Sequence, residues 1–134
     1  MGNIAVITIK QDNTPQEDWQ SLYLHWHGGR DTVEPLLHVA KLYEVRCDSS
    51  YGIARLSQIM GNYFGGTLSL GVGTYKQLHT NNYDNGVYVV QDWEIVDREF
   101  APEYEQREYN FKEMVADIRS KNDKVFGYEE KANV

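Results

Sequence analysis

Hydrophobic and polar residues alternate in several short stretches of the chain, and a period of two is typical of β-strands with one buried face. The stretch at residues 4–10 is rich in Ile and Val, and the stretches at 87–90 and 93–96 are separated only by Gln91-Asp92, which suits a tight turn or a bulge. The predicted strands are residues 4–10, 22–27, 67–72, 87–90 and 93–96.

Three other stretches carry apolar residues at helical spacing. In residues 33–46 the stripe is Val33, Leu36, Leu37, Ala40 and Tyr43, and in residues 53–64 it is Ile53, Leu56, Ile59, Met60, Tyr63 and Phe64. Asp48 is placed to cap the second helix, and Gly65-Gly66 provides a glycine stop. Asn110 and Glu113 form a capping box that opens a last helix with Phe111, Met114, Val115 and Ile118 on one face.

The order of these elements is β-β-α-α-β-β-β-α, with strands clustered rather than alternating with helices. This order predicts an α+β fold, in which a mainly antiparallel sheet of about five strands carries the helices on one face. The helical pair is inserted after the second strand, and the last helix is C-terminal. We expect residues 1–121 to form a single domain and residues 122–134 to be a frayed tail.

Composition limits the cellular setting. Cys47 is the only cysteine, which excludes an intrachain disulfide and a cluster of zinc-binding thiolates. The apolar runs are too short to span a bilayer, and the N-terminus lacks the pattern of a signal peptide. The sequence therefore predicts a cytoplasmic protein that does not bind membranes.

The chain is acidic, with a net charge of −7. From Gln91 onward there are 12 acidic and 7 basic residues, so most of the surplus lies in the C-terminal part. Such a chain repels phosphate backbones, which disfavours direct nucleic-acid binding. One interpretation is that the negative charge only keeps the protein soluble. The other is that it suits a basic surface on a host protein or a protein–nucleic-acid complex. The candidate partner-binding residues are Glu103, Tyr104, Glu105, Glu108 and Tyr109.

The segment His25-Trp26-His27-Gly28-Gly29-Arg30 is the candidate ligand site. If the strand continues to residue 27, Trp26 lies on the core face with Leu22 and Leu24, while His25 and His27 share the other face about 6 to 7 Å apart. The two glycines allow a sharp turn, and Asp31 or Thr32 is expected to cap the helix that follows. Arg30 then stands at a helix entrance, where with the histidines it would attract a phosphate or carboxylate. The competing interpretation is structural: a strand, a turn and a helix start.

Known catalytic patterns are missing from the sequence. The two histidines have no third metal ligand in register and no HExxH spacing, and the glycine-rich stretches 65–67 and 71–74 lack the lysine of a phosphate-binding loop. Cys47 has no local signature of a nucleophile, and there is no GxSxG elbow. We therefore expect no catalytic residue, no metal and no cofactor.

One resemblance covers residues 22–100. The stretches Leu22-Tyr23-Leu24-His25-Trp26-His27-Gly28-Gly29, Tyr51-Gly52-Ile53-Ala54-Arg55-Leu56, and Asn85 to Val90 with Asp92 to Val96 look like small uncharacterised proteins carried by bacteria, phages and prophages. The resemblance implies a genomic setting, in which small acidic proteins often inhibit host defence systems, as anti-CRISPR proteins do. Together these observations favour a non-enzymatic binding protein that inhibits a host defence component. The alternative is a protein that binds a small ligand or nucleotide, or a hydrolase, built on His25, His27 and Arg30.

Overall fold

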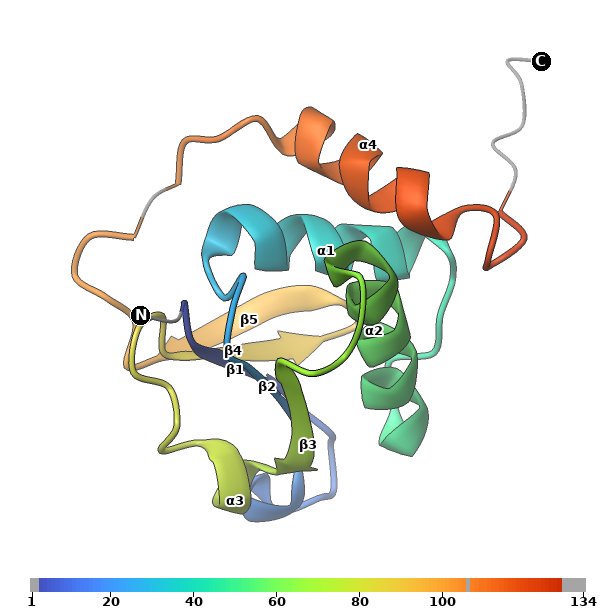
Figure 1. The fold of residues 1–134 in the computed structure, drawn as a ribbon. Coiled ribbons are helices and arrows are strands. Elements are labelled where there is room, and N and C mark those ends of the chain that lie inside the picture. The colour runs from blue at the N-terminus through green and yellow to red at the C-terminus, as the bar shows by residue number, and fades with distance from the viewer. Residues whose placement is uncertain (1–2, 106, 129–134) are drawn as a thin grey trace.

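The computed structural model describes residues 3–105 and 107–128, and at its centre is a five-stranded sheet in the order β3-β2-β1-β4-β5 (Figure 1). The pairs β1–β2, β2–β3 and β4–β5 are antiparallel, whereas β1 and β4 are parallel. The sheet is therefore mostly antiparallel, and the predicted α+β class and element order are confirmed. The strands are β1 (Ala5–Ile9), β2 (Gln20–Leu24), β3 (Leu70–Thr74), β4 (Val87–Gln91) and β5 (Glu94–Glu99).

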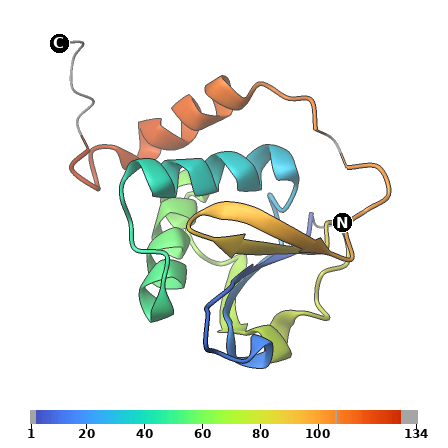
Figure 2. The same ribbon diagram turned by 180° about the vertical axis from the view of Figure 1, so that it is seen from behind.

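Helices cover the two faces of the sheet unequally. One face carries α1, α2 and α4, with α4 packed on α1 and α2, while η1 and α3 lie against the other face (Figures 1 and 2). None of the helices in the described part of the chain is long and apolar enough to cross a membrane. The helices are η1 (Gln16–Asp18, a 3-10 turn), α1 (Arg30–Leu42), α2 (Ser49–Phe64), α3 (Tyr75–Leu78) and α4 (Phe111–Asn122).

The core lies on both sides of the central strands, because alternate side chains of a strand point to opposite faces. Every residue of β1 is buried. Ile7 and Ile9 pack beneath the helices, whereas Val6 joins Val87 and Val89 on the opposite face, against Trp19, Tyr75 and Leu78. On that opposite face the buried Ser21 hydroxyl donates a hydrogen bond to the buried Thr8 hydroxyl oxygen at 2.8 Å.

The second strand is shorter than predicted, and the placement of Trp26 in the core is wrong. β2 ends at Leu24, and the chain bends at His25, whose carbonyl accepts a hydrogen bond from the Asn3 N–H at 2.9 Å. His27 adopts a left-handed conformation with φ of 61°, so the alternation on which the prediction relied does not extend past the strand. The Trp26 side chain is consequently 45% exposed.

The helix ends follow local signals in most places. α2 stops at Gly65 in the left-handed conformation, as predicted, while Asp48 is its N-cap residue but makes no capping hydrogen bond with its side chain. The Asn110 side chain caps α4 by accepting from the Glu113 N–H at 3.0 Å, which is one of the two hydrogen bonds of the predicted capping box. α1, however, begins at Arg30 with Gly29 in the capping position, so neither Asp31 nor Thr32 is the cap. The short helix α3 was not expected, although Thr74 and Gln77 form a capping box at its start.

Packed structure continues past residue 121. Asn122 is fully buried, and its side-chain amide donates to the carbonyl oxygens of Ile59 at 3.1 Å and Ile118 at 3.0 Å. The Phe126 ring stacks on Tyr43 with 5.1 Å between ring centres. Residues 122–128 of the predicted tail are thus packed on the fold, and residues 129–134 are not among the residues that the structure describes.

Candidate functional site

The segment between β5 and α4, residues 100–110, crosses the end of the sheet without regular secondary structure (Figure 1). We call it the acidic segment; its residue 106 lies outside the described structure. The five residues predicted to bind a partner all belong to it. Loops of this kind, held on a rigid scaffold, commonly carry binding function.

Glu105 anchors the acidic segment to the fold. Its carboxylate lies between two arginines: Arg30 Nη1 at the start of α1, at 3.3 Å from Oε2, and Arg98 Nη1 of β5, which donates to Oε1. The Glu105 side chain is only 9% exposed. Paired charges shielded from water interact more strongly than exposed pairs, so this contact fixes the middle of the segment.

Neighbouring groups extend this anchor into a network. Glu34 accepts from Arg30 Nη2 at 3.0 Å and from the Tyr109 hydroxyl, which ties the end of the segment to α1. The Arg98 guanidinium lies 3.7 Å from the centre of the Tyr88 ring, close enough for a cation–π contact. The acidic segment is thereby joined to both α1 and the sheet.

The pKa values in this network reflect its charges. Burial alone would raise the pKa of Glu105, but hydrogen bonds and charges from Arg98, and then from Arg30, outweigh burial and lower it below its ordinary value of 4.5. Burial raises the pKa of Tyr109, and the bond to the Glu34 carboxylate raises it further. The carboxylate of Glu105 and the phenol of Tyr109 therefore keep their anchoring forms at neutral pH.

The outer side of the acidic segment is exposed to solvent, unlike the buried Glu105 side chain. Tyr104 is 89% exposed, and Glu103 and Glu108 are also exposed. Phe100, at the start of the segment, is an exposed large apolar residue. A hollow of about 440 Å³ lies beside these groups, lined by Arg98, Ala101, Pro102, Glu103, Tyr104, Glu105 and Arg107.

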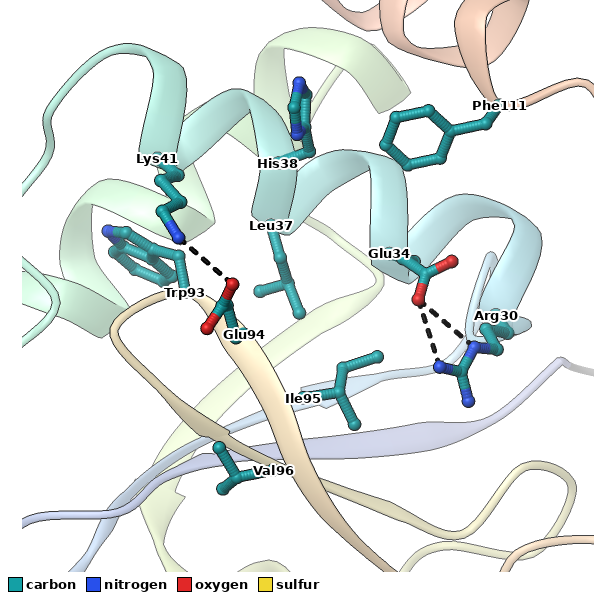
Figure 3. A pocket seen from close by; sticks show the side chains of 10 residues that line it. All are labelled: Arg30, Glu34, Leu37, His38, Lys41, Trp93, Glu94, Ile95, Val96 and Phe111. Atoms are coloured by element: carbon teal, nitrogen blue, oxygen red, sulfur yellow. Dashed lines mark hydrogen bonds and ion pairs between the residues drawn. The ribbon is translucent and has the colours of Figure 1, made fainter.

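A second cavity, of about 540 Å³, runs between α1 and β5 and meets the acidic segment at Arg30 and Glu34 (Figure 3). We call it the α1–β5 groove. Leu37 and Ile95 supply apolar side chains, and the ion pair between Lys41 and Glu94, at 3.1 Å, lies at one end (Figure 3). The remaining lining residues are His38, Trp93, Val96 and Phe111.

The residues predicted to form a ligand site have separate partners in the structure. His25 Nδ1 lies 2.9 Å from the Tyr23 hydroxyl, while the His27 ring stacks on Phe64 of α2 with 4.4 Å between ring centres. Arg30 is at the helix entrance as predicted, but its guanidinium is occupied by Glu34 and Glu105. Each of the three side chains therefore has its own partner, and a ligand site built on them stays a prediction.

Two other kinds of chemistry, metal binding and attack by a cysteine thiolate, can be compared with the described residues. Within residues 3–105 and 107–128 there is no group of three or more His, Cys, Asp or Glu side chains that could hold a metal ion. Burial raises the pKa of the Cys47 thiol, which opposes formation of the nucleophilic thiolate.

Sequence reasoning missed Glu34, Arg98 and the α1–β5 groove, because these groups meet only through the fold. Phe100 was also left out of the candidate residues, although it directly precedes the acidic run and aromatic residues are enriched at protein interfaces. Comparison with protein families, characterised proteins and solved structures finds no match for the chain. The candidate site is therefore argued from the positions and contacts of its residues alone.

Proposed function

We propose that this chain is a non-enzymatic binding protein that contacts a partner protein through the outer side of the acidic segment and the adjoining α1–β5 groove. The observation that carries the proposal is the anchoring of Glu105 between Arg30 and Arg98, which leaves Glu103 and Tyr104 exposed on a segment tied down at its centre. A loop that is ordered before binding loses less conformational entropy in the complex. Exposed tyrosines are also among the residues that contribute most to protein interfaces.

The charge of this surface indicates the kind of partner. Glu103 and Glu108 are exposed acidic groups of the segment, in a chain of net charge −7. Such a surface attracts a basic protein surface and speeds its association, particularly at low salt. Basic surfaces are typical of nucleic-acid-binding proteins. We therefore propose a host protein or protein–nucleic-acid complex as the partner, without direct contact to nucleic acid.

The resemblance to small phage and prophage proteins supports a cytoplasmic inhibitor of a host defence component. Binding to a basic surface would compete with the nucleic acid that such a component needs. A ligand site at His25, His27 and Arg30 has no comparable support, because each side chain has a different partner.

The test is capture from host lysate by tagged protein, followed by quantitative mass spectrometry. The variants are Glu103→Lys and Tyr104→Ala, both at exposed positions. Their matched controls are Glu17→Lys in η1 and Tyr51→Ala in α2, which are exposed and lie on other elements. We expect at least one protein to be retained by the wild type and both controls but reduced about tenfold with each variant. Equal capture by all five forms would refute the proposed surface.

A further inference from the structure

The two edges of the sheet differ in how they are protected. Edge strands expose unpaired backbone groups and usually carry charges, bulges or a cover that prevents pairing with other chains. β5 has such protection: a register shift opposite Val89 and Val90 interrupts its ladder, and the Asp97 carboxylate accepts from the Arg98 N–H at 2.8 Å. Four of its residues, Glu94, Asp97, Arg98 and Glu99, are charged.

β3, at the opposite edge, has neither the charged side chains nor the register shift of β5 (Figure 1). Residues 65–75 contain no charged side chain, although a quarter of the whole chain is charged. Val72, in the middle of the strand, is 63% exposed. Leu68, two residues before the strand, is fully exposed, and Leu68 and Trp26 line one hollow with Leu70. This edge is therefore apolar as well as uncharged.

The hydrogen bonds show which backbone groups of β3 face outward. The Ser69 carbonyl accepts from the His25 N–H at 2.9 Å, and the Tyr75 N–H donates to the Trp19 carbonyl at 2.8 Å. Because backbone groups alternate in direction along an antiparallel strand, Gly71 and Gly73 also face β2, while Leu70, Val72 and Thr74 face outward.

Two of the outward N–H groups are already bonded within the chain. The Leu70 N–H donates to the Thr67 carbonyl at 3.1 Å, and the Thr74 N–H donates to Gln77 Oε1 at 2.9 Å. At Val72, by contrast, neither the N–H nor the carbonyl has a partner among the described residues. Val72 is thus the outward residue of β3 that still offers a backbone donor, and it offers its carbonyl as an acceptor as well.

We propose that this edge pairs with a second copy of the chain, with the two β3 strands antiparallel and Val72 opposite Val72. In this arrangement a twofold axis passes between the two Val72 residues, so the N–H of each Val72 meets the carbonyl of the other and these four groups are satisfied together. A longer foreign strand would find the donors of Leu70 and Thr74 already bonded. The uncharged stretch also lets two acidic chains meet without opposing like charges at the seam.

The first test is the molar mass in solution, measured by sedimentation velocity from low micromolar to submillimolar concentration. We expect the wild type to form dimers as concentration rises, and Val72→Lys to weaken dimerisation more than about tenfold because it places like charges opposite each other. Val96→Lys, an exposed valine on the protected edge, should dimerise like the wild type. A monomeric wild type, or a Val72→Lys variant that dimerises normally, would overturn the proposal.

A cross-link tests the register itself. Residues in a hydrogen-bonded antiparallel pair have Cα atoms about 5.5 Å apart, which suits a disulfide. In a Cys47→Ser background, Val72→Cys should form a disulfide-linked dimer on mild oxidation, with an unchanged circular dichroism spectrum. Val96→Cys in the same background is the control. Cross-linking of Val72→Cys that is no faster than that of the control would contradict the pairing, whatever the result for Val72→Lys.

Discussion

Replacing Glu105 by alanine should destabilise the protein strongly, although this residue belongs to a segment without regular secondary structure. The substitution removes the acceptor for both Arg30 and Arg98, whose side chains are 21% and 13% exposed. It leaves two partly buried guanidinium groups with fewer partners. Desolvated charges without partners are the costly outcome of breaking such a pair.

The expected loss is about 2 to 4 kcal/mol of unfolding free energy. Breaking a fully buried ion pair typically costs about 3 to 5 kcal/mol. The lower figure applies here because both arginines keep some exposure, Arg30 retains Glu34, and Arg98 Nε keeps its bond to the Val87 carbonyl at 3.2 Å. Glu103→Ala, two residues away and exposed, should change stability by less than about 0.5 kcal/mol.

The difference in stability between the wild type and Glu105→Ala should decrease as the pH falls. The pKa of Glu105 is lowered in the folded protein, so its stabilising contribution is present above the ordinary value of 4.5 and is lost as the pH falls through the lowered pKa. The gap between wild type and Glu105→Ala should therefore be constant near neutrality and shrink in acid.

Urea unfolding followed by circular dichroism, at several pH values, measures both effects. If Glu105→Ala is no less stable than Glu103→Ala at pH 7, the anchoring of the acidic segment by ion pairs is refuted. If the gap persists unchanged in acid, the stabilisation comes from packing rather than from the Glu105 charge.

Two further predictions concern stability and are measured by the same unfolding experiment. Trp26→Ala should lower the unfolding free energy by less than about 1 kcal/mol, because the side chain is 45% exposed. Trp93→Ala should lower it by about 3 to 5 kcal/mol, because Trp93 is 5% exposed and donates to the Val45 carbonyl. Equal losses for the two variants would contradict the bend after β2. Asn122→Ala should cost about 1 to 3 kcal/mol, since its buried amide joins α4 to the Ile59 carbonyl and its oxygen accepts from Asn62; a neutral result would place residue 122 outside the cooperative fold.

Local chemistry in the sequence was sufficient to predict most elements. The apolar stripe and glycine stop of α2, and the cap at Asn110, depend on neighbours within a few residues, and the structure has them as predicted. β2 was extended too far because alternation of residue types does not report backbone dihedrals, and His27 has a positive φ. The parallel pairing of β1 with β4 joins residues some 80 positions apart, which no local pattern specifies.

Contacts between residues far apart in the sequence also decide the roles of the candidate site residues. Charge identified the acidic segment, but it could not separate Glu103 from Glu105, which are two residues apart in one acidic run. Glu105 became an anchor because the fold brings together Arg30, which lies 75 residues away in the sequence, and Arg98. Partner-binding roles for Glu103, Tyr104, Glu105, Glu108 and Tyr109 all remain predictions, and Glu105 and Tyr109 also bind other parts of the molecule.

Amide hydrogen exchange of the protein alone and saturated with its captured partner tests the central proposal most directly. Exchange reports, segment by segment, which backbone amides become protected on binding. The proposed function predicts new protection in the acidic segment and along the adjoining residues of α1 and β5, with none at residues 25–29. Protection confined to residues 25–29, or an unchanged acidic segment, would contradict it.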